Sequence, residues 1–183
     1  MTEELSNYQL RAATPADVPA LHDLIARSIR ALGAADYSAV QIESALTSAF
    51  GVDTTLIRDG TYFVAEAKDG VLVACGGWSR RRTLFGSDTR ADRDESWLDP
   101  AMDAAKIRAF FVDPDHVRHG LGRLILKRSE QEAKRAGFSS LALMATLPGV
   151  RFYERHGYNA EVAISYPLAG GLTIRFVPMS KRL

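Results

Sequence analysis

The segment 118–123, Arg-His-Gly-Leu-Gly-Arg, has the residue types of a phosphate-binding turn. It follows an apolar run at 109–112 that predicts a buried strand, and it precedes an apolar periodicity that predicts a helix. The first N–H groups of a helix lack partners within the helix, and the helix dipole adds positive potential there. The arrangement of strand, turn and helix therefore predicts a pyrophosphate site, to which Arg118 and Arg123 can add charge.

Two common nucleotide-binding signatures do not fit this segment. A dinucleotide fingerprint needs Gly or Ala three residues after Gly122, where Ile125 stands. It also needs an acidic residue about 20 positions further on, where the chain has Leu141 and Ala142. A P-loop needs Gly-Lys-Ser/Thr, which this segment lacks. A lone Gly-x-Gly also fits an ordinary helix start, so the segment alone leaves its ligand open.

A second block of candidate residues lies about 30 positions downstream. It reads Phe152-Tyr153-Glu154 followed by Gly157-Tyr158, and Val112-x-Pro114 precedes the first block. Together the blocks resemble the GNAT N-acyltransferases. A helix start at Thr14-Pro15 and a hairpin at Asp69-Gly70 extend the resemblance over nearly the whole chain. The first block resembles that family's acyl-CoA pyrophosphate loop, and the second resembles the segment beside the thiol.

The resemblance implies a set of contacts with acetyl-CoA, the expected co-substrate. In the family the fourth and fifth strands splay apart, and pantetheine lies between them. The implied contact residues are Phe110, Phe111, Val112, Val117, Arg118, His119, Gly120, Leu121, Gly122, Arg123 and Thr146. Two of these depart from the family pattern. Val117 stands where Gln or Arg is usual, which leaves backbone N–H donation intact, and Thr146 stands where Asn is frequent and can still hydrogen-bond.

The resemblance also makes Tyr153 the predicted catalytic acid. Amine attack on a thioester ends with expulsion of the CoA thiolate, and a Tyr hydroxyl with a pKa of about 10 can protonate that sulfur. By residue type alone, Tyr153 fits a packing role. Family analogy further implies an oxyanion-binding N–H near Phe111. Candidates for the general base are Glu43, Glu66 and Asp103, each of which also fits an ordinary solvated carboxylate.

We expect no metal site and no nucleophilic cysteine. Asp113, Asp115, His116 and His119 cluster around one turn, but the phosphate loop accounts for that turn, and zinc needs four convergent ligands. Cys75 lies in an apolar strand without a basic neighbour, which favours a buried thiol. A single cysteine without a disulfide partner fits a reducing, cytoplasmic location.

The pattern of apolar residues and turn signals predicts a mixed α/β chain. We expect strands at residues 8–12, 61–67, 71–79, 106–112, 141–145, 160–166 and 172–179, and helices at 15–32, 38–50, 121–136 and 148–156. In the second helix, the candidate inward residues are Val40, Ile42, Leu46 and Phe50.

These elements predict a mixed, mostly antiparallel twisted sheet of about seven strands with helices on both faces. The resemblance adds that strands four and five are splayed. We expect one domain over 1–183, with a cofactor-binding segment at 106–158 and a long connection at 80–105. Trp78, Phe85 and Trp97 either line a pocket beside that connection or belong to the core.

Composition narrows the possible partners. The 183 residues carry a formal net charge of +1, which gives no basic excess for nucleic acid or a membrane surface. No apolar run approaches the length of about 20 residues that spans a bilayer, and residues 1–6 do not resemble a signal peptide.

The combined expectation is acetyl transfer from acetyl-CoA to a primary amine in a ternary complex. The acceptor is expected to be a small molecule, and the chain a possible homodimer. A non-catalytic acyl-CoA-binding module, a protein N-acetyltransferase and a nucleotide-binding protein remain as alternatives.

Overall fold

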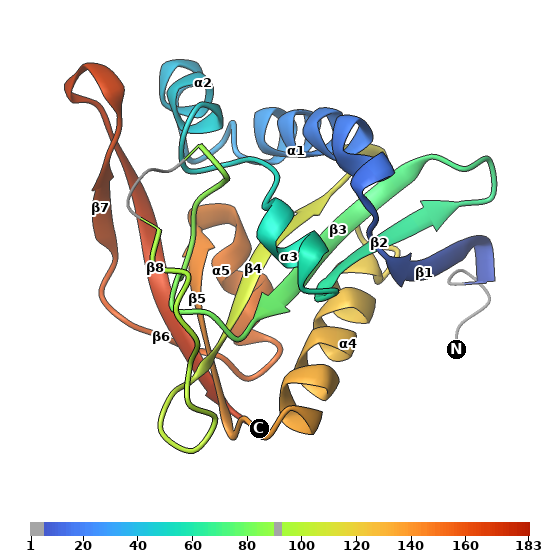
Figure 1. Ribbon diagram of the computed structural model, residues 1–183. Coiled ribbons are helices and arrows are strands. Elements are labelled where there is room, and N and C mark those ends of the chain that lie inside the picture. The colour runs from blue at the N-terminus through green and yellow to red at the C-terminus, as the bar shows by residue number, and fades with distance from the viewer. Residues whose placement is uncertain (1–5, 90–92) are drawn as a thin grey trace.

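The computed structural model describes residues 6–89 and 93–183, which form one twisted eight-stranded sheet with helices on both faces (Figure 1). The sheet order is β1-β2-β3-β4-β5-β8-β6, and β7 also pairs with β8. All neighbouring pairs are antiparallel except β4 and β5, which are parallel. The strands are β1 (Tyr8–Ala12), β2 (Tyr62–Ala67), β3 (Leu72–Ser79), β4 (Ala105–Val112), β5 (Ser140–Thr146), β6 (Asn159–Ala160), β7 (Ile164–Pro167) and β8 (Thr173–Arg182).

The α-helices cover the sheet in two groups. They are α1 (Val18–Leu32), α2 (Ala39–Leu46), α3 (Thr54–Arg58), α4 (Leu121–Arg135) and α5 (Val150–Glu154), and short 3₁₀ turns lie at Pro15–Asp17, Pro114–His116, Leu147–Gly149 and Ala169–Gly171. Helices α1, α2 and α3 pack on one face, and α4 and α5 pack on the other (Figure 1). Among the described residues, no helix combines the length and apolar character needed to cross a bilayer.

Alternating residues of the sheet supply two separate cores. In β2, Tyr62 and Val64 belong to the core under α1, whereas Phe63 and Ala65 belong to the core under α4. This is the two-residue period of a strand whose two faces are both buried. Burial on both faces fixes the register of the central strands, and that register positions the residues at the carboxyl end of β4.

Local sequence signals account for the start of α1. The carboxylate of Asp17 accepts a hydrogen bond from the Thr14 backbone N–H at 2.7 Å, as in a capping box. The guanidinium of Arg11 donates two further hydrogen bonds of 2.8 Å to the same carboxylate. The hydrogen bond and charge of Arg11 lower the pKa of Asp17 to about 2, despite partial burial.

The predicted fold class is confirmed, with four local corrections. The second helix ends at Leu46, earlier than expected, and Val40 is exposed because it points away from the core. Helix α3 was not predicted, since its apolar residues are too few to establish a period. The last predicted strand pair is three strands, because 160–166 divides into β6 and β7.

Strands β4 and β5 separate soon after they begin. Their pairing is limited to Ala105 with Leu141 and Lys106 with Ala142. From Ile107 onward β4 keeps its partner β3, whereas β5 continues to pair with β8. The predicted splay is therefore present, and it leaves one edge of β4 without a strand partner.

Candidate active site

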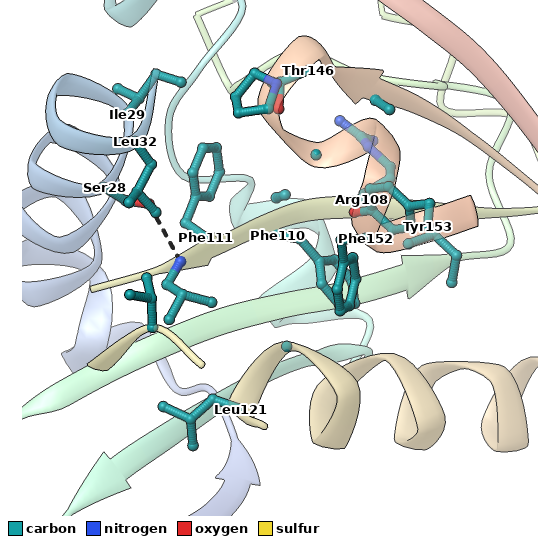
Figure 2. Close-up of a pocket in the computed structure, with 18 of the residues that line it drawn as sticks. Ser28, Ile29, Leu32, Arg108, Phe110, Phe111, Leu121, Thr146, Phe152 and Tyr153 are labelled. Atoms are coloured by element: carbon teal, nitrogen blue, oxygen red, sulfur yellow. Dashed lines mark hydrogen bonds between the residues drawn. The ribbon is translucent and has the colours of Figure 1, made fainter. Parts of the chain in front are cut away.

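The splay opens into a cavity of about 1030 Å³ that runs from the start of α4 to α1 (Figure 2). Figure 2 shows Phe111 on the side of β4 that faces α1, whereas Phe110 lies with Phe152 and Tyr153 on the other side. Its wall is made by Ser28, Ile29, Leu32, Phe50, Leu84, Phe85, Ile107, Arg108, Ala109, Phe110, Phe111, Val112, His116, Val117, Arg118, Gly120, Leu121, Gly122, Arg123, Met144, Ala145, Thr146, Pro148, Gly149, Phe152, Tyr153, Arg155, His156 and Phe176.

The loop before α4 contributes residues to the wall of this cavity. Arg118 has φ 68° and Gly120, the residue preceding α4, has φ 81°. Such alternation of left-handed residues turns successive N–H groups toward one point, which creates an anion-binding concavity. A side chain at Gly122 would place its Cβ 3.3 Å from the Phe152 ring, so glycine permits close packing of α4 against that ring. The loop can therefore hold a phosphate group at the helix N-terminus.

Strand β4 contains a bulge at the centre of the cavity. Cys75 of β3 is opposite Phe111, and Gly77 is opposite Arg108, so β4 has an extra residue between these pairs. Ala109 has φ 56°, which is uncommon for a residue with a side chain. Ala109 and Arg118 are the positive-φ non-glycine residues of the described chain, and both line the cavity. Strained backbone of this kind is frequent at functional sites.

A buried tyrosine holds the orientation of the bulge. The hydroxyl of Tyr62 donates to the Ala109 carbonyl oxygen at 3.0 Å, and the Cys75 thiol lies 3.9 Å from the same oxygen. In a trans peptide the C=O and the following N–H point in opposite directions. The N–H of Phe110 therefore points away from Tyr62 and Cys75. Burial raises the pKa of the Cys75 thiol to about 12, so this thiol is protonated and is no nucleophile at neutral pH.

The open edge of β4 also carries the N–H of Val112. The Asp113 N–H bonds the Val73 carbonyl of β3 at 2.8 Å, so the preceding N–H faces away from β3. The Val112 N–H reaches the Ser28 hydroxyl of α1 at 3.3 Å (Figure 2). Ser28 is thus a site residue that the sequence analysis missed, since its position in an ordinary amphipathic helix carries no signal.

Tyr153 and Thr146 present polar groups to the cavity from the other side. Within the described chain, neither the Tyr153 hydroxyl nor the Thr146 hydroxyl has a protein hydrogen-bond partner. The Tyr153 ring is buried between Phe110, at 6.3 Å between ring centroids, and Tyr158, at 5.6 Å. Burial raises the pKa of Tyr153 above its ordinary value, which keeps the hydroxyl protonated and able to donate.

The cavity end near α1 is apolar and comes from distant parts of the chain. The residues that form this acceptor-side wall are Ile29, Leu32, Phe50, Leu84, Phe85, Phe111, Met144 and Phe176. The rings contact one another, with centroid distances of 5.5 Å between Phe85 and Phe176 and 6.2 Å between Phe50 and Phe111. Of the three aromatic residues considered near the long connection, Phe85 therefore lines the cavity. Trp78 is in the core against Phe138, and Trp97 is exposed.

One charged side chain on β4 borders the same end. Arg108 is buried, and its Nη2 lies 2.8 Å from Oδ2 of the fully buried Asp53 and donates to the Gly86 carbonyl at 2.6 Å. Asp53 also pairs with Arg93 at 2.7 Å, so the long connection is tied to α3 and β4. This connection, which was expected to be a loop, also forms an isolated bridge between Arg81 and Trp97.

Most of the predicted contact residues converge on this cavity. Of the eleven contact residues that the resemblance implies, only His119 is outside the wall. Its imidazole lies 3.4 Å from the Tyr8 hydroxyl, which also meets His116 at 3.0 Å. The three candidate bases lie elsewhere: Glu43 pairs with Arg30, Glu66 with Arg11 and Asp103 with Arg82. Each of the three carboxylates is therefore an ion-pair partner outside the cavity wall, which fits the ordinary structural role considered for it.

Three further residues of the site were not predicted from the sequence: Tyr62, which bonds the bulge, and Leu84 and Phe176, which line the cavity. Each is an apolar or aromatic residue in a strand or loop, and its role depends on which other segments fold against it. The four residues considered for a metal have other contacts, such as the 2.7 Å bond from Arg27 to Asp113. No cluster of metal-binding side chains occurs in the described chain.

Comparison with known proteins gives a family for this arrangement. The model of the acetyltransferase (GNAT) family matches residues 26–158. No protein with a curated function matches the sequence. A solved structure of a GCN5-related N-acetyltransferase from Rhodopseudomonas palustris is similar in fold, with a TM-score of 0.71, 21% identity, and coverage of 96% of this chain and 95% of that chain.

Two further solved structures share the fold at lower identity. The PaiA N-acetyltransferase from Thermoplasma acidophilum, in complex with coenzyme A, has a TM-score of 0.64 at 16% identity, covering 96% of this chain and 99% of that one. A ribosomal-protein-alanine N-acetyltransferase from Brucella melitensis has a TM-score of 0.64 at 18% identity, with the same coverages of 96% and 99%. Because the family model matches most of the chain, the protein belongs to the GNAT family of acetyltransferases.

Proposed function

We propose that this acetyltransferase transfers the acetyl group of acetyl-CoA directly to a primary amine of a small molecule. The observation that carries the proposal is the convergence of two features on one cavity: the N–H-rich loop at 117–123 and the unpartnered hydroxyl of Tyr153. An anion-binding loop alone supports binding, whereas a protonated hydroxyl beside the expected thioester supports chemistry.

The cofactor side uses mainly backbone groups. Acetyl-CoA supplies the activated acetyl group as a thioester. In this proposal the N–H groups of 117–123 bind its pyrophosphate, with Arg118 and Arg123 as cationic side chains. The open edge of β4 at 110–112 receives pantetheine, and Thr146 offers a hydroxyl from β5. The Ser28 hydroxyl accepts a hydrogen bond from the Val112 N–H. When pantetheine binds, this hydrogen bond either remains or is replaced by one from the Val112 N–H to pantetheine.

The reacting centre lies at the bulge. The acceptor nitrogen forms a bond to the thioester carbon while the carbonyl oxygen becomes an oxyanion, for which the Phe110 N–H is the proposed donor. The carbon–sulfur bond then breaks, its electron pair passes to sulfur, and the Tyr153 hydroxyl donates a proton to that sulfur. Water takes the proton that the amine loses and restores the proton of Tyr153. The products are an N-substituted acetamide and the free thiol of CoA.

The test measures CoA thiol release with and without an amine, together with transfer of an isotopically labelled acetyl group into amide product. Amine-dependent release with the label in the product is expected. Saturable acetyl-CoA binding without turnover on any amine would establish the non-catalytic module instead. Label found only in added proteins would establish a protein N-acetyltransferase.

The cellular location is proposed on chemistry alone. Cys75 is buried and free, and a single thiol without a disulfide partner fits a reducing compartment. We therefore propose that the enzyme acts in the cytoplasm.

A further inference from the structure

We propose that the acceptor is a primary amine attached to an apolar, ring-bearing group, without a second positive charge. This inference rests on the proposed function and names the substrate class of the same site. It follows from two properties of the cavity: the apolar surface of the acceptor-side wall, and the absence of Asp and Glu from the described residues that line the cavity.

The first property is the size and chemistry of the apolar surface. The acceptor-side wall, defined above by its eight residues, contains four phenylalanines, three aliphatic side chains and one methionine. Phe50 meets Phe176 edge-to-face, with ring centroids 5.9 Å apart, and Phe85 meets Tyr166 at 4.9 Å. Aromatic rings in this arrangement offer both faces and edges to a further ring. A hydrocarbon or aryl group removed from water against such a wall is stabilised in proportion to its buried area.

The second property is the distribution of charge. In the part of the chain that the structure describes, no Asp or Glu lines the cavity, whereas Arg108, Arg118, Arg123 and Arg155 do. The carboxylate of Asp53, which pairs with Arg108, is fully buried and also pairs with Arg93. An ammonium group in this cavity would lose its hydration without gaining a carboxylate partner among the described lining residues, and such a loss is costly.

The two properties together discriminate between classes of amine. A monoamine can enter as the free base, because its single ammonium can deprotonate before the chemical step. A polyamine, an aminoglycoside or a lysine-rich peptide keeps further charges that must be desolvated beside Arg108. A hydroxylated amine deprotonates but leaves its hydroxyl groups without partners on the apolar wall. The apolar wall therefore favours aryl and aralkyl monoamines.

The first experiment compares kcat/KM for three probe amines: 2-phenylethylamine, ethanolamine and spermidine. We expect 2-phenylethylamine to exceed each of the others by on the order of 100-fold, the range that burial of a ring-sized group gives. Equal or greater kcat/KM for spermidine or ethanolamine would overturn the inference while leaving amine acetylation established. Absence of turnover on every amine, despite acetyl-CoA binding, would instead overturn the proposed function.

The second experiment adds the missing charge to the wall. Leu32, 37% exposed at the end of α1, lines the cavity and can accept a polar substitution (Figure 2). We expect Leu32→Glu to raise kcat/KM for spermidine by about 10-fold over Leu32→Gln, which has the same shape without the charge. Val40→Glu is the matched control, because Val40 is 64% exposed on α2 and does not line the cavity. A similar gain in Val40→Glu, or no gain in Leu32→Glu, would contradict the account.

Discussion

The two ends of the cavity are constructed in different ways. The cofactor end is made largely by one continuous segment, 112–123, most of whose residues line the cavity, including the left-handed residues Arg118 and Gly120. The acceptor end is made by side chains from α1, the segment after α2, the long connection, β4, β5 and β8. A main-chain site depends on local backbone geometry, whereas a side-chain site depends on how remote segments pack. The same fold can therefore keep one co-substrate while its acceptor changes.

The largest expected effect comes from a substitution that distorts the backbone at the cofactor end of the cavity. Gly120→Val places a β-branched residue at φ 81°, where the strain is of the order of 1–2 kcal/mol or more. Rotation of the N–H groups away from the pyrophosphate should raise the Kd for acetyl-CoA by about 100-fold, measured by calorimetry.

The matched control for this change is Gly170→Val. Gly170 has a similar φ of 69° and lies in the turn between β7 and β8, where an added Cβ meets nothing within 4 Å. It should cost comparable strain without changing acetyl-CoA affinity. If both variants lose affinity equally, general destabilisation would explain the effect, and the distinction between the two ends would fail.

This distinction also explains how much the sequence could predict. Glycines and prolines at fixed spacings determine local geometry, so the loop before α4, the hairpin at Asp69-Gly70 and the start of α1 were all predicted correctly. Tyr153 was singled out by the resemblance to the GNAT family, since by residue type alone it fits a packing role. Ser28, Tyr62 and Phe176 could not be predicted, because each is an ordinary residue of its helix or strand until another segment packs against it.

The ion pairs of the three candidate bases illustrate the same limit. Glu43, Glu66 and Asp103 were candidate bases by residue type, but their partners Arg30, Arg11 and Arg82 are distant in sequence. Helix α3 is short, and its position depends on the buried Asp53 at its N-cap and on the two arginines that pair with Asp53. Such tertiary ion pairs leave no periodic trace in the sequence.

An intermediate effect is expected where the two ends meet. Tyr62→Phe removes the hydroxyl that holds the Ala109 carbonyl and thereby loosens the direction of the Phe110 N–H. We expect kcat to fall by about 10-fold, less than the roughly 100-fold or more that complete removal of an oxyanion donor costs, and KM for acetyl-CoA to change little. Steady-state kinetics measures the changes in kcat and in KM separately. A rise in KM at unchanged kcat would make Tyr62 a packing residue for the cofactor end.

The smallest expected effect is in the pH profile. Because burial raises the pKa of Tyr153, its proton is retained through pH values at which an exposed tyrosine, with a pKa of about 10, begins to ionise. With a saturating acceptor, kcat should therefore not decline between about pH 8 and pH 10. Below the pKa of the acceptor, kcat/KM should rise with pH, because the free-base fraction increases. A decline in kcat with a midpoint at about pH 10 or below, the ordinary range of a tyrosine, would show that the hydroxyl is not shielded as described.

Tyr153 lies where the two ends of the cavity join, and the proposed chemistry depends most directly on its hydroxyl. The decisive measurement is kcat and acetyl-CoA affinity for Tyr153→Phe, with Tyr158→Phe as the control. Tyr158 is a neighbouring buried tyrosine whose hydroxyl bonds Glu130 at 3.0 Å and does not line the cavity. We predict a fall in kcat of about 100-fold for Tyr153→Phe at nearly unchanged acetyl-CoA affinity, as expected for loss of a general acid. Unchanged kcat in Tyr153→Phe, or an equal fall in Tyr158→Phe, would contradict the proposed role of Tyr153.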